Sequence, residues 1–122
     1  MRILVVDDAP DARDTMKMLL EIQGHHVEVA SNGKEAVEVA ADHLPDLVLM
    51  DLTMPIMDGL TATRQLRHRR ETESMPIVAL SAYLRDGLWR DKAFAAGCNE
   101  CLSKPVDFGA LDRVLSRFDP LH

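Results

Sequence analysis

Polar side chains that suit metal-assisted phosphate chemistry stand where short apolar segments of the chain end. Asp7 and Asp8 follow one such segment, Asp51 ends a second, Ser81 follows a third and Lys104 a fourth. If the fold brings the three carboxylates together, they repel one another, and a divalent cation removes that conflict. Oxygen ligands alone suit Mg²⁺, which proteins often bind together with phosphate. A lysine and a hydroxyl facing such a site would stabilise an incoming phosphoryl group.

Asp51 allows two interpretations from its local sequence. The apolar run Leu47–Met50 leads into Asp51, and a loop with Pro55 and Gly59 follows. An unbroken apolar run is typical of a strand buried on both faces of a parallel sheet, whose carboxyl edge is where ligands bind. There the carboxylate could be a nucleophile that forms an aspartyl phosphate, or it could only cap the loop by accepting backbone N–H bonds. The rest of the chain has to distinguish them.

Strands and helices alternate along the chain, which predicts how these side chains are positioned. The predicted strands are Ile3–Val6, Val27–Ala30, Leu47–Asp51, Ile77–Leu80 and Glu100–Ser103. Apolar residues at helical spacing predict five helices, from Pro10 to a stop at Gly24 and over 36–44, 60–70, 84–96 and 108–118. This alternation indicates an α/β fold, a parallel sheet with helices on both faces. Right-handed crossovers favour the flavodoxin-like order 2-1-3-4-5, whose switch point lies between the first and third strands.

The overall charge argues against a nucleic-acid-binding surface. The 122 residues, enough for one domain with a core, include 20 acidic and 14 basic side chains and carry a net charge of -6. The only basic run, Arg67–Arg70, ends a predicted helix, where cations offset the helix dipole. We therefore expect this run to be a solvated helix end and not a binding patch.

The sequence also predicts a protein of the cytoplasm that makes no membrane contact. It contains no apolar run long enough to span a bilayer, and its first eight residues reach acids too early for a signal peptide. Two cysteines do not make a disulfide framework, so a reducing compartment is expected.

Taken together and in order, the motifs resemble the receiver domain of two-component response regulators. They are Asp7-Asp8, Asp51 with Met54-Pro55-Ile56-Met57-Asp58-Gly59 behind it, Ser81-Ala82 and Lys104-Pro105. The resemblance covers nearly the whole chain and implies a single receiver domain over residues 1–122, without an output domain in this chain. It implies a phosphoacceptor signalling domain and not an enzyme, one that catalyses only its own phosphotransfer and autodephosphorylation.

The resemblance assigns the metal and phosphate chemistry to particular residues. Asp51 would accept the phosphoryl group from a phosphohistidine on a sensor histidine kinase or a histidine phosphotransfer protein. Asp8, Asp51 and the Thr53 carbonyl would bind Mg²⁺ directly, and Asp7 would act through water. The downstream protein target would bind the face formed by the fourth helix, the fifth strand and the last helix, and no nucleic acid would be bound directly.

Further residues are expected to bind the phosphoryl group or to set its lifetime. The resemblance implies that Lys104, Ser81 and Ala82 contact the phosphoryl group and that the peptide bond before Pro105 is cis. Thr53 and Tyr83 each follow a site residue by two positions and would influence how fast water removes the phosphate.

Cys101 departs from the family pattern. Receivers usually carry Tyr or Phe three residues before the lysine, as the aromatic that moves together with the residue at Ser81. We therefore expect the switch formed by Ser81 and Cys101 to couple phosphorylation to the fourth helix more weakly. Cys98 and Cys101 also form a C-x-x-C motif, which could be a redox pair or half a metal site. No second cysteine pair exists, and the motif leads into a strand and does not open a helix.

Two other functions remain as alternatives. A magnesium-dependent phosphatase of the haloacid-dehalogenase type also uses an aspartate at a strand end, but it needs a second acid two residues later, where this chain has Thr53. A nucleotide or flavin binder of the same fold would carry a glycine-rich phosphate loop, and neither common form of that loop is present. The sequence favours the receiver domain.

Overall fold

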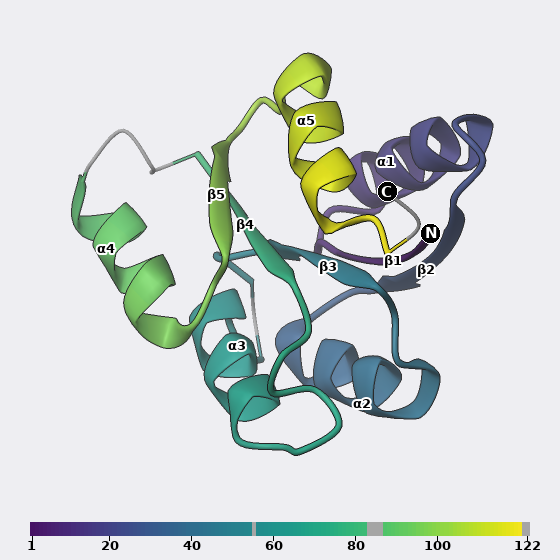
Figure 1. The fold of residues 1–122 in the computed structure, drawn as a ribbon. Helices are drawn as coiled ribbons and strands as arrows, with labels where there is room; N and C mark the ends of the chain where they lie inside the picture. The colour runs from purple at the N-terminus through teal and green to yellow at the C-terminus, as the bar shows by residue number, and fades with distance from the viewer. Residues whose placement is uncertain (55, 83–86, 121–122) are drawn as a thin grey trace.

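The computed structural model describes residues 1–54, 56–82 and 87–120 and has a five-stranded parallel sheet as its middle layer (Figure 1). The strands are β1 (Arg2–Val6), β2 (His26–Ala30), β3 (Leu47–Asp51), β4 (Ile77–Ser81) and β5 (Glu100–Ser103). Their order in the sheet is β2-β1-β3-β4-β5, and every neighbouring pair is parallel. This confirms the predicted α/β fold and its strand order.

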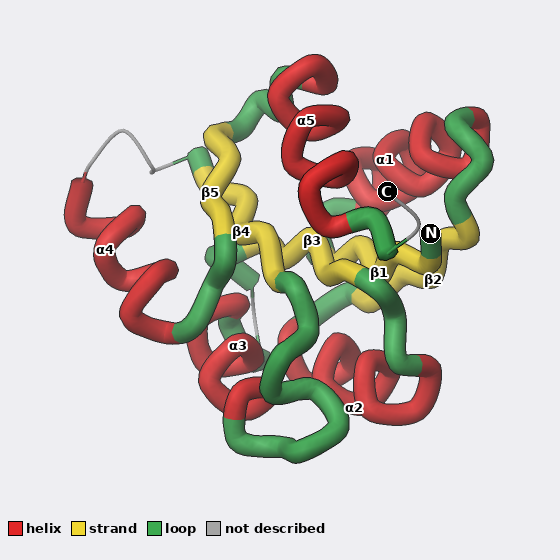
Figure 2. The backbone as a smooth tube through the Cα atoms, in the orientation of Figure 1, coloured by secondary structure: helices red, strands yellow, loops and turns green. Residues whose placement is uncertain are grey.

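Helices cover both faces of the sheet (Figure 2). α1 (Pro10–Ile22) and α5 (Phe108–Phe118) lie on one face, and α2 (Gly33–His43), α3 (Gly59–Arg67) and α4 (Gly87–Ala96) lie on the other. The fourth helix was expected from Leu84, but Leu84 lies outside the described residues, and α4 as described begins at Gly87. Among the helices of the described ranges, none combines the length and apolar character needed to cross a membrane.

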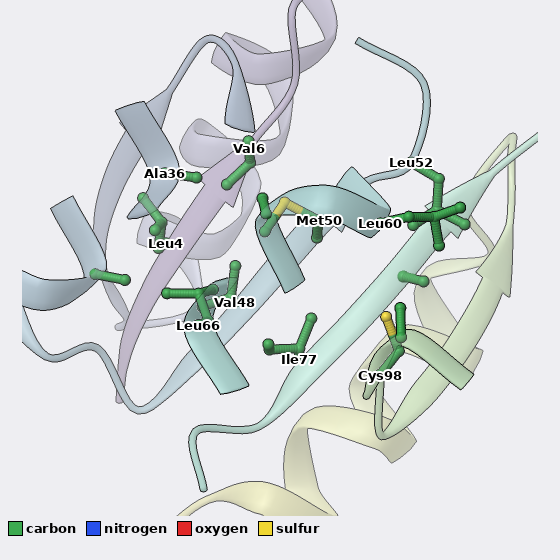
Figure 3. Packing of buried hydrophobic residues seen from close by; sticks show 14 of the residues in the cluster. Leu4, Val6, Ala36, Val48, Met50, Leu52, Leu60, Leu66, Ile77 and Cys98 are labelled. Atoms are coloured by element: carbon green, nitrogen blue, oxygen red, sulfur yellow. The ribbon is translucent and has the colours of Figure 1, made fainter. Parts of the chain in front are cut away.

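Each central strand contributes side chains to both hydrophobic layers. In β1, Leu4 and Val6 belong to the cluster beneath α2, α3 and α4, whereas Ile3 and Val5 belong to the cluster beneath α1 and α5. Figure 3 shows Leu4 and Val6 in the first of these clusters, together with residues of β3, β4 and α3. Burial on both faces explains why the strands read as continuous apolar runs and not as alternating ones.

Polar side chains fix where three of the helices begin. Asn32 accepts a hydrogen bond from the Glu35 N–H at the start of α2, and Asp58 accepts one from the Thr61 N–H at the start of α3. Asp107 does the same for the first turn of α5. Such caps satisfy N–H groups that have no partner within the helix. They also fix the ends of the loops that follow β2, β3 and β5.

The loop between β3 and α3 is held closely against the sheet and against α2. A Cβ added at Gly59 would lie 2.2 Å from the backbone oxygen of Asp51, and one added at Gly33 would lie 2.4 Å from the backbone oxygen of Met57. The Gly33 N–H donates a hydrogen bond of 2.9 Å to that same Met57 oxygen. Only glycine permits such close backbone contacts, so these two positions determine the path of the loop.

The expectation that the whole basic run Arg67–Arg70 is solvated is wrong for Arg67. Its guanidinium donates hydrogen bonds of 2.8–3.2 Å that join the end of α3 to two loops. The acceptors are the backbone carbonyls of Thr72, Glu73, Met75 and Gly97 and the side-chain oxygen of Asn99. A guanidinium carries five N–H groups and can therefore serve several carbonyls at once. Arg69 and Arg70 are exposed, as predicted.

We predict that Arg67→Met lowers the free energy of unfolding by about 2–4 kcal/mol, because several carbonyls lose a charged hydrogen-bond donor. Urea denaturation followed by circular dichroism measures this change. Arg69→Met, at an exposed position nearby, is the control and should change stability by less than about 0.5 kcal/mol. Equal stability of the two variants would contradict a structural role for Arg67.

Candidate functional site

The carboxyl edge of the sheet brings Asp7, Asp8 and Asp51 together. β1 and β3 are neighbours, with Val6 paired to Met50, so the residues that follow these two positions lie side by side. One carboxylate oxygen from each of the three aspartates lies within 4.8 Å of the others. Asp7 and Asp51 are 6% and 5% exposed, whereas Asp8 is exposed. The acidic cluster predicted at the switch point is therefore present.

Lys104 bridges the two buried carboxylates of this cluster. Its Nζ lies 3.1 Å from Asp7 Oδ2 and 3.1 Å from Asp51 Oδ2. The other oxygen of Asp51 accepts a hydrogen bond of 3.1 Å from the Thr53 N–H, and the other oxygen of Asp7 accepts one of 2.9 Å from the Ala9 N–H. Asp51 thus caps its loop with one oxygen and pairs with Lys104 through the other. Asp51 can therefore cap the loop and be a carboxylate of the site at the same time, so the two interpretations of its local sequence are compatible.

Burial and pairing set the protonation behaviour of this ion pair. Burial raises the pKa of Asp51, and the Thr53 N–H and Lys104 oppose that rise by favouring the charged form. Burial acts to lower the pKa of Lys104, but the hydrogen bonds and charges of Asp51 and Asp7 outweigh it, so the pKa of Lys104 is raised. Lys104 is therefore a firmly charged ammonium.

The donor set of the cluster fits a hard divalent cation. One ammonium faces three carboxylates, which leaves two negative charges uncompensated. Asp7 already uses both oxygens in hydrogen bonds, whereas within the described residues no hydrogen bond to the exposed Asp8 carboxylate is found. Of the three carboxylates, Asp8 is therefore the one most available to a hard cation, and the ranking of Asp51 above Asp7 as a direct ligand remains a prediction. The Thr53 carbonyl follows in the same loop, and its role as a ligand remains a prediction.

Ser81 and Ala82 stand at the end of the neighbouring strand. Ser81 is the last residue of β4 and is fully buried, and Ala82 is exposed beside it. The Lys104 N–H donates a hydrogen bond of 3.0 Å to the Ser81 carbonyl, which ties the ends of β4 and β5 together. The peptide bond between Lys104 and Pro105 is cis, as the resemblance implied. Tyr83 lies outside the described residues, so its effect on phosphate lifetime remains a prediction.

The two cysteines are buried, free thiols in the cluster under α3 and α4. Burial, helped by the nearby Cys98, raises the pKa of Cys101 to about 11. Burial also raises the pKa of Cys98. Since the thiolate is the reactive form, both side chains are poor nucleophiles at neutral pH, which argues against a redox pair. The half-buried Trp89 of α4 packs against the same cluster.

The sequence analysis missed two features that border the site. The Arg13 guanidinium donates a hydrogen bond of 3.2 Å to the Asp7 carbonyl, and a cation on the helix after the acid pair could have signalled this. A groove of about 410 Å³ opens between α1 and the start of α5, with Asp7 and Lys104 among its lining residues. Its walls are mainly apolar.

Comparison with known proteins gives the family. The family model of the response regulator receiver domain matches residues 3–116. The chain therefore belongs to the response regulator receiver domains, signalling domains of two-component phosphorelays and not enzymes of the usual kind.

Three relatives illustrate the similarity. Protein PilH of Pseudomonas aeruginosa is 39% identical over 117 residues, which cover 94% of each protein. The receiver domain of sensor histidine kinase PA1611 from P. aeruginosa PAO1, solved with a magnesium ion in its active site cleft, is 34% identical with a TM-score of 0.89, and the match covers 96% of this chain and 95% of that one. The Saccharomyces cerevisiae co-crystal of the histidine phosphotransfer protein Ypd1 with the Ssk1 receiver domain matches at 28% identity and a TM-score of 0.87, covering 97% and 88%.

We predict that Mg²⁺ raises the melting temperature of the protein and that Asp8→Asn removes most of this increase. A ligand that binds only the folded state stabilises it by about 2.7 kcal/mol at one hundred times its Kd. Asp7→Asn should weaken Mg²⁺ binding less, by about 10–100-fold in affinity, because the family resemblance implies that Asp7 acts on the metal through water.

Differential scanning calorimetry with and without Mg²⁺ tests this ranking, and Asp14→Asn, on the exposed side of α1, is the control. An unchanged Mg²⁺ response in Asp8→Asn, or a greater loss in Asp7→Asn, would show that the assignment of ligands is wrong.

Proposed function

We propose that Asp51 accepts a phosphoryl group from a phosphohistidine of a partner protein. The observation that carries this proposal is the position of Asp51 within the acidic cluster, with one oxygen 3.1 Å from Lys104 Nζ. Asp8 and Asp51, with the Thr53 carbonyl, would hold Mg²⁺ directly, and Asp7 would act through water. When bound, Mg²⁺ supplies positive charge to the phosphoryl oxygens during transfer.

The residues of the chain have separate tasks in this step. A carboxylate oxygen of Asp51 attacks phosphorus, the P–N bond breaks, and its electron pair stays on the histidine nitrogen of the donor. Lys104 stays within reach of the oxygens that carry the negative charge, and the Ser81 hydroxyl and the Ala82 N–H donate hydrogen bonds to them. Lys104 thereby loses part of its contact with the Asp51 carboxylate and gains a contact with the transferred phosphoryl group.

The same geometry favours slow self-hydrolysis over turnover of free phosphate esters. A phosphatase of the haloacid-dehalogenase type needs an acid two residues after its nucleophile, and here the Thr53 N–H caps Asp51 while the Thr53 side chain has no acidic proton to give. We infer that water removes the phosphate from Asp51 without a dedicated general acid. Tyr83 would shield the site from this water, whereas Thr53 would neither position nor block it strongly.

The donor and the target belong to recognisable classes of protein. A sensor histidine kinase or a histidine phosphotransfer protein would supply the phosphoryl group, in keeping with the receiver domains of PA1611 and Ssk1 among the similar structures. A downstream protein would bind the face formed by α4, β5 and α5. The two free thiols are consistent with work in a reducing cytoplasm.

We expect incubation with Mg²⁺ and acetyl phosphate to add a single phosphate to the native chain and none to Asp51→Asn. Intact-mass spectrometry measures the addition, and chelation of the metal should stop it because the developing charge loses its counterion. Asp46→Asn, on an aspartate remote from the acidic cluster, is the control and should be phosphorylated normally. Phosphate on Asp51→Asn would mean that another residue is the acceptor.

Cys101 would transmit phosphorylation less strongly than an aromatic side chain. When the Ser81 hydroxyl moves toward the phosphoryl group it leaves space beside β5, and Cys101 is too small to fill it. Unfilled space forfeits packing contacts, so the phosphorylated conformation gains less stability. Phosphorylation then shifts the equilibrium between two conformations of α4. The size of the shift is the difference in free energy with which the phosphoryl group stabilises the two conformations, typically about 1–3 kcal/mol.

Trp89 on α4 should report this difference. We expect its fluorescence to change modestly when the native protein is phosphorylated and more when Cys101→Tyr is phosphorylated. Cys101→Val adds volume without a ring and should behave like the native protein. The fluorescence change of the native protein could instead be large and the same in Cys101→Tyr. That result would contradict the idea that the missing aromatic limits the coupling.

A further inference from the structure

Ile56 is an apolar side chain that the backbone holds in solvent. Its φ is +70°, and it is 81% exposed. A positive φ is rare outside glycine and asparagine, and for a β-branched residue it is a strained conformation. Among the described non-glycine residues only Leu44 shares a positive φ, and Leu44 ends α2, where the left-handed conformation is common. Ile56 ends no helix.

The described residues of the loop on either side of Ile56 have contacts with the rest of the chain. Met54 and Met57 are half-buried and pack against the core cluster under α2 and α3. The Met57 carbonyl is held by the Gly33 N–H, and Asp58 caps α3, so the chain on this side of Ile56 is fixed. Glycine or asparagine would adopt the conformation with less strain. Isoleucine neither relieves the strain nor contributes to the core, so its use at this position calls for a partner outside the chain.

We propose that Ile56 is a docking residue for the phosphohistidine-bearing partner, an inference that rests on the proposed function of Asp51. The donor imidazole has to reach Asp51, and the loop that carries Ile56 begins at that residue. An exposed apolar side chain there loses water when an apolar surface of the partner covers it. Because the backbone that follows Ile56 is already held, less conformational entropy is lost there on docking. The partner is a protein that presents apolar side chains beside its phosphohistidine.

Two phosphate donors separate docking from chemistry. Phosphoramidate carries the same P–N bond without a protein surface, and phosphorylated Ypd1 presents a phosphohistidine on a protein known to bind a receiver domain. Ile56→Gly and Ile56→Asn fit the backbone and remove the apolar side chain, whereas Ile56→Leu keeps an apolar side chain. Ile22→Asn is the matched control, because Ile22 is 75% exposed at the end of α1, away from the carboxyl edge of the sheet.

We expect Ile56→Gly and Ile56→Asn to lower kcat/KM for transfer from Ypd1 about tenfold, in the range of a docking contact at an interface. Their phosphorylation by phosphoramidate should match that of the native protein. Ile56→Leu and Ile22→Asn should keep transfer from Ypd1 near the native value. The urea midpoint of Ile56→Gly should rise, because the strain is relieved while no core contact is lost.

Several outcomes would overturn the proposal. One is unchanged transfer from Ypd1 in Ile56→Asn, and another is no transfer from Ypd1 to the native protein. A third is an equal loss of the transfer rate with Ypd1 and with phosphoramidate, which would mean that Ile56 takes part in the chemistry itself. Self-association of the native chain that Ile56→Asn abolishes in sedimentation experiments would identify a second copy as the partner instead. Failure of the proposed function is a distinct result, because the native protein would then take no phosphate from phosphoramidate.

Discussion

The structure depends on keeping one ammonium between two buried carboxylates. Asp7 and Asp51 are almost inaccessible to water, and Lys104 lies 3.1 Å from an oxygen of each. Removing one partner from such a group leaves an uncompensated buried charge, which is far costlier than the net value of the pair. The three residues come from the ends of different strands, so the sheet order and the β5–α5 connection must be correct together. The site and the fold therefore constrain each other.

Strand order and the residues at strand ends could be predicted because both follow from simple patterns. Continuous apolar runs mark strands buried on both faces, and regular alternation with helices leaves few topologies. The carboxyl ends of parallel strands meet at one edge, so Asp7, Asp51 and Lys104 could be placed together before any distance was known. The bounds of the strands shifted by only one residue, as at Arg2 and His26, because the apolar core ends before the hydrogen-bonded ladder does.

Features that depend on how loops close could not be predicted. Arg67 and its neighbours Arg69 and Arg70 have the same chemistry in the sequence, but only Arg67 faces carbonyls from two loops that are remote along the chain. The positive φ of Ile56 likewise occurs next to a contact between Gly33 and Met57, which are more than twenty residues apart. Propensities of single residues carry no information on such contacts, and isoleucine would even argue against this conformation.

The close contact between Gly59 and the backbone of Asp51 gives the site a stiff side and a compliant side. There is no room for even a methyl group between the start of α3 and the end of β3, so a group added to Asp51 cannot displace the chain in that direction. On the other side, α4 is buried only through the small side chains of Ala93 and Ala96, supported by the half-buried Trp89. The packing around Asp51 therefore resists a displacement toward α3 more strongly than a displacement toward α4.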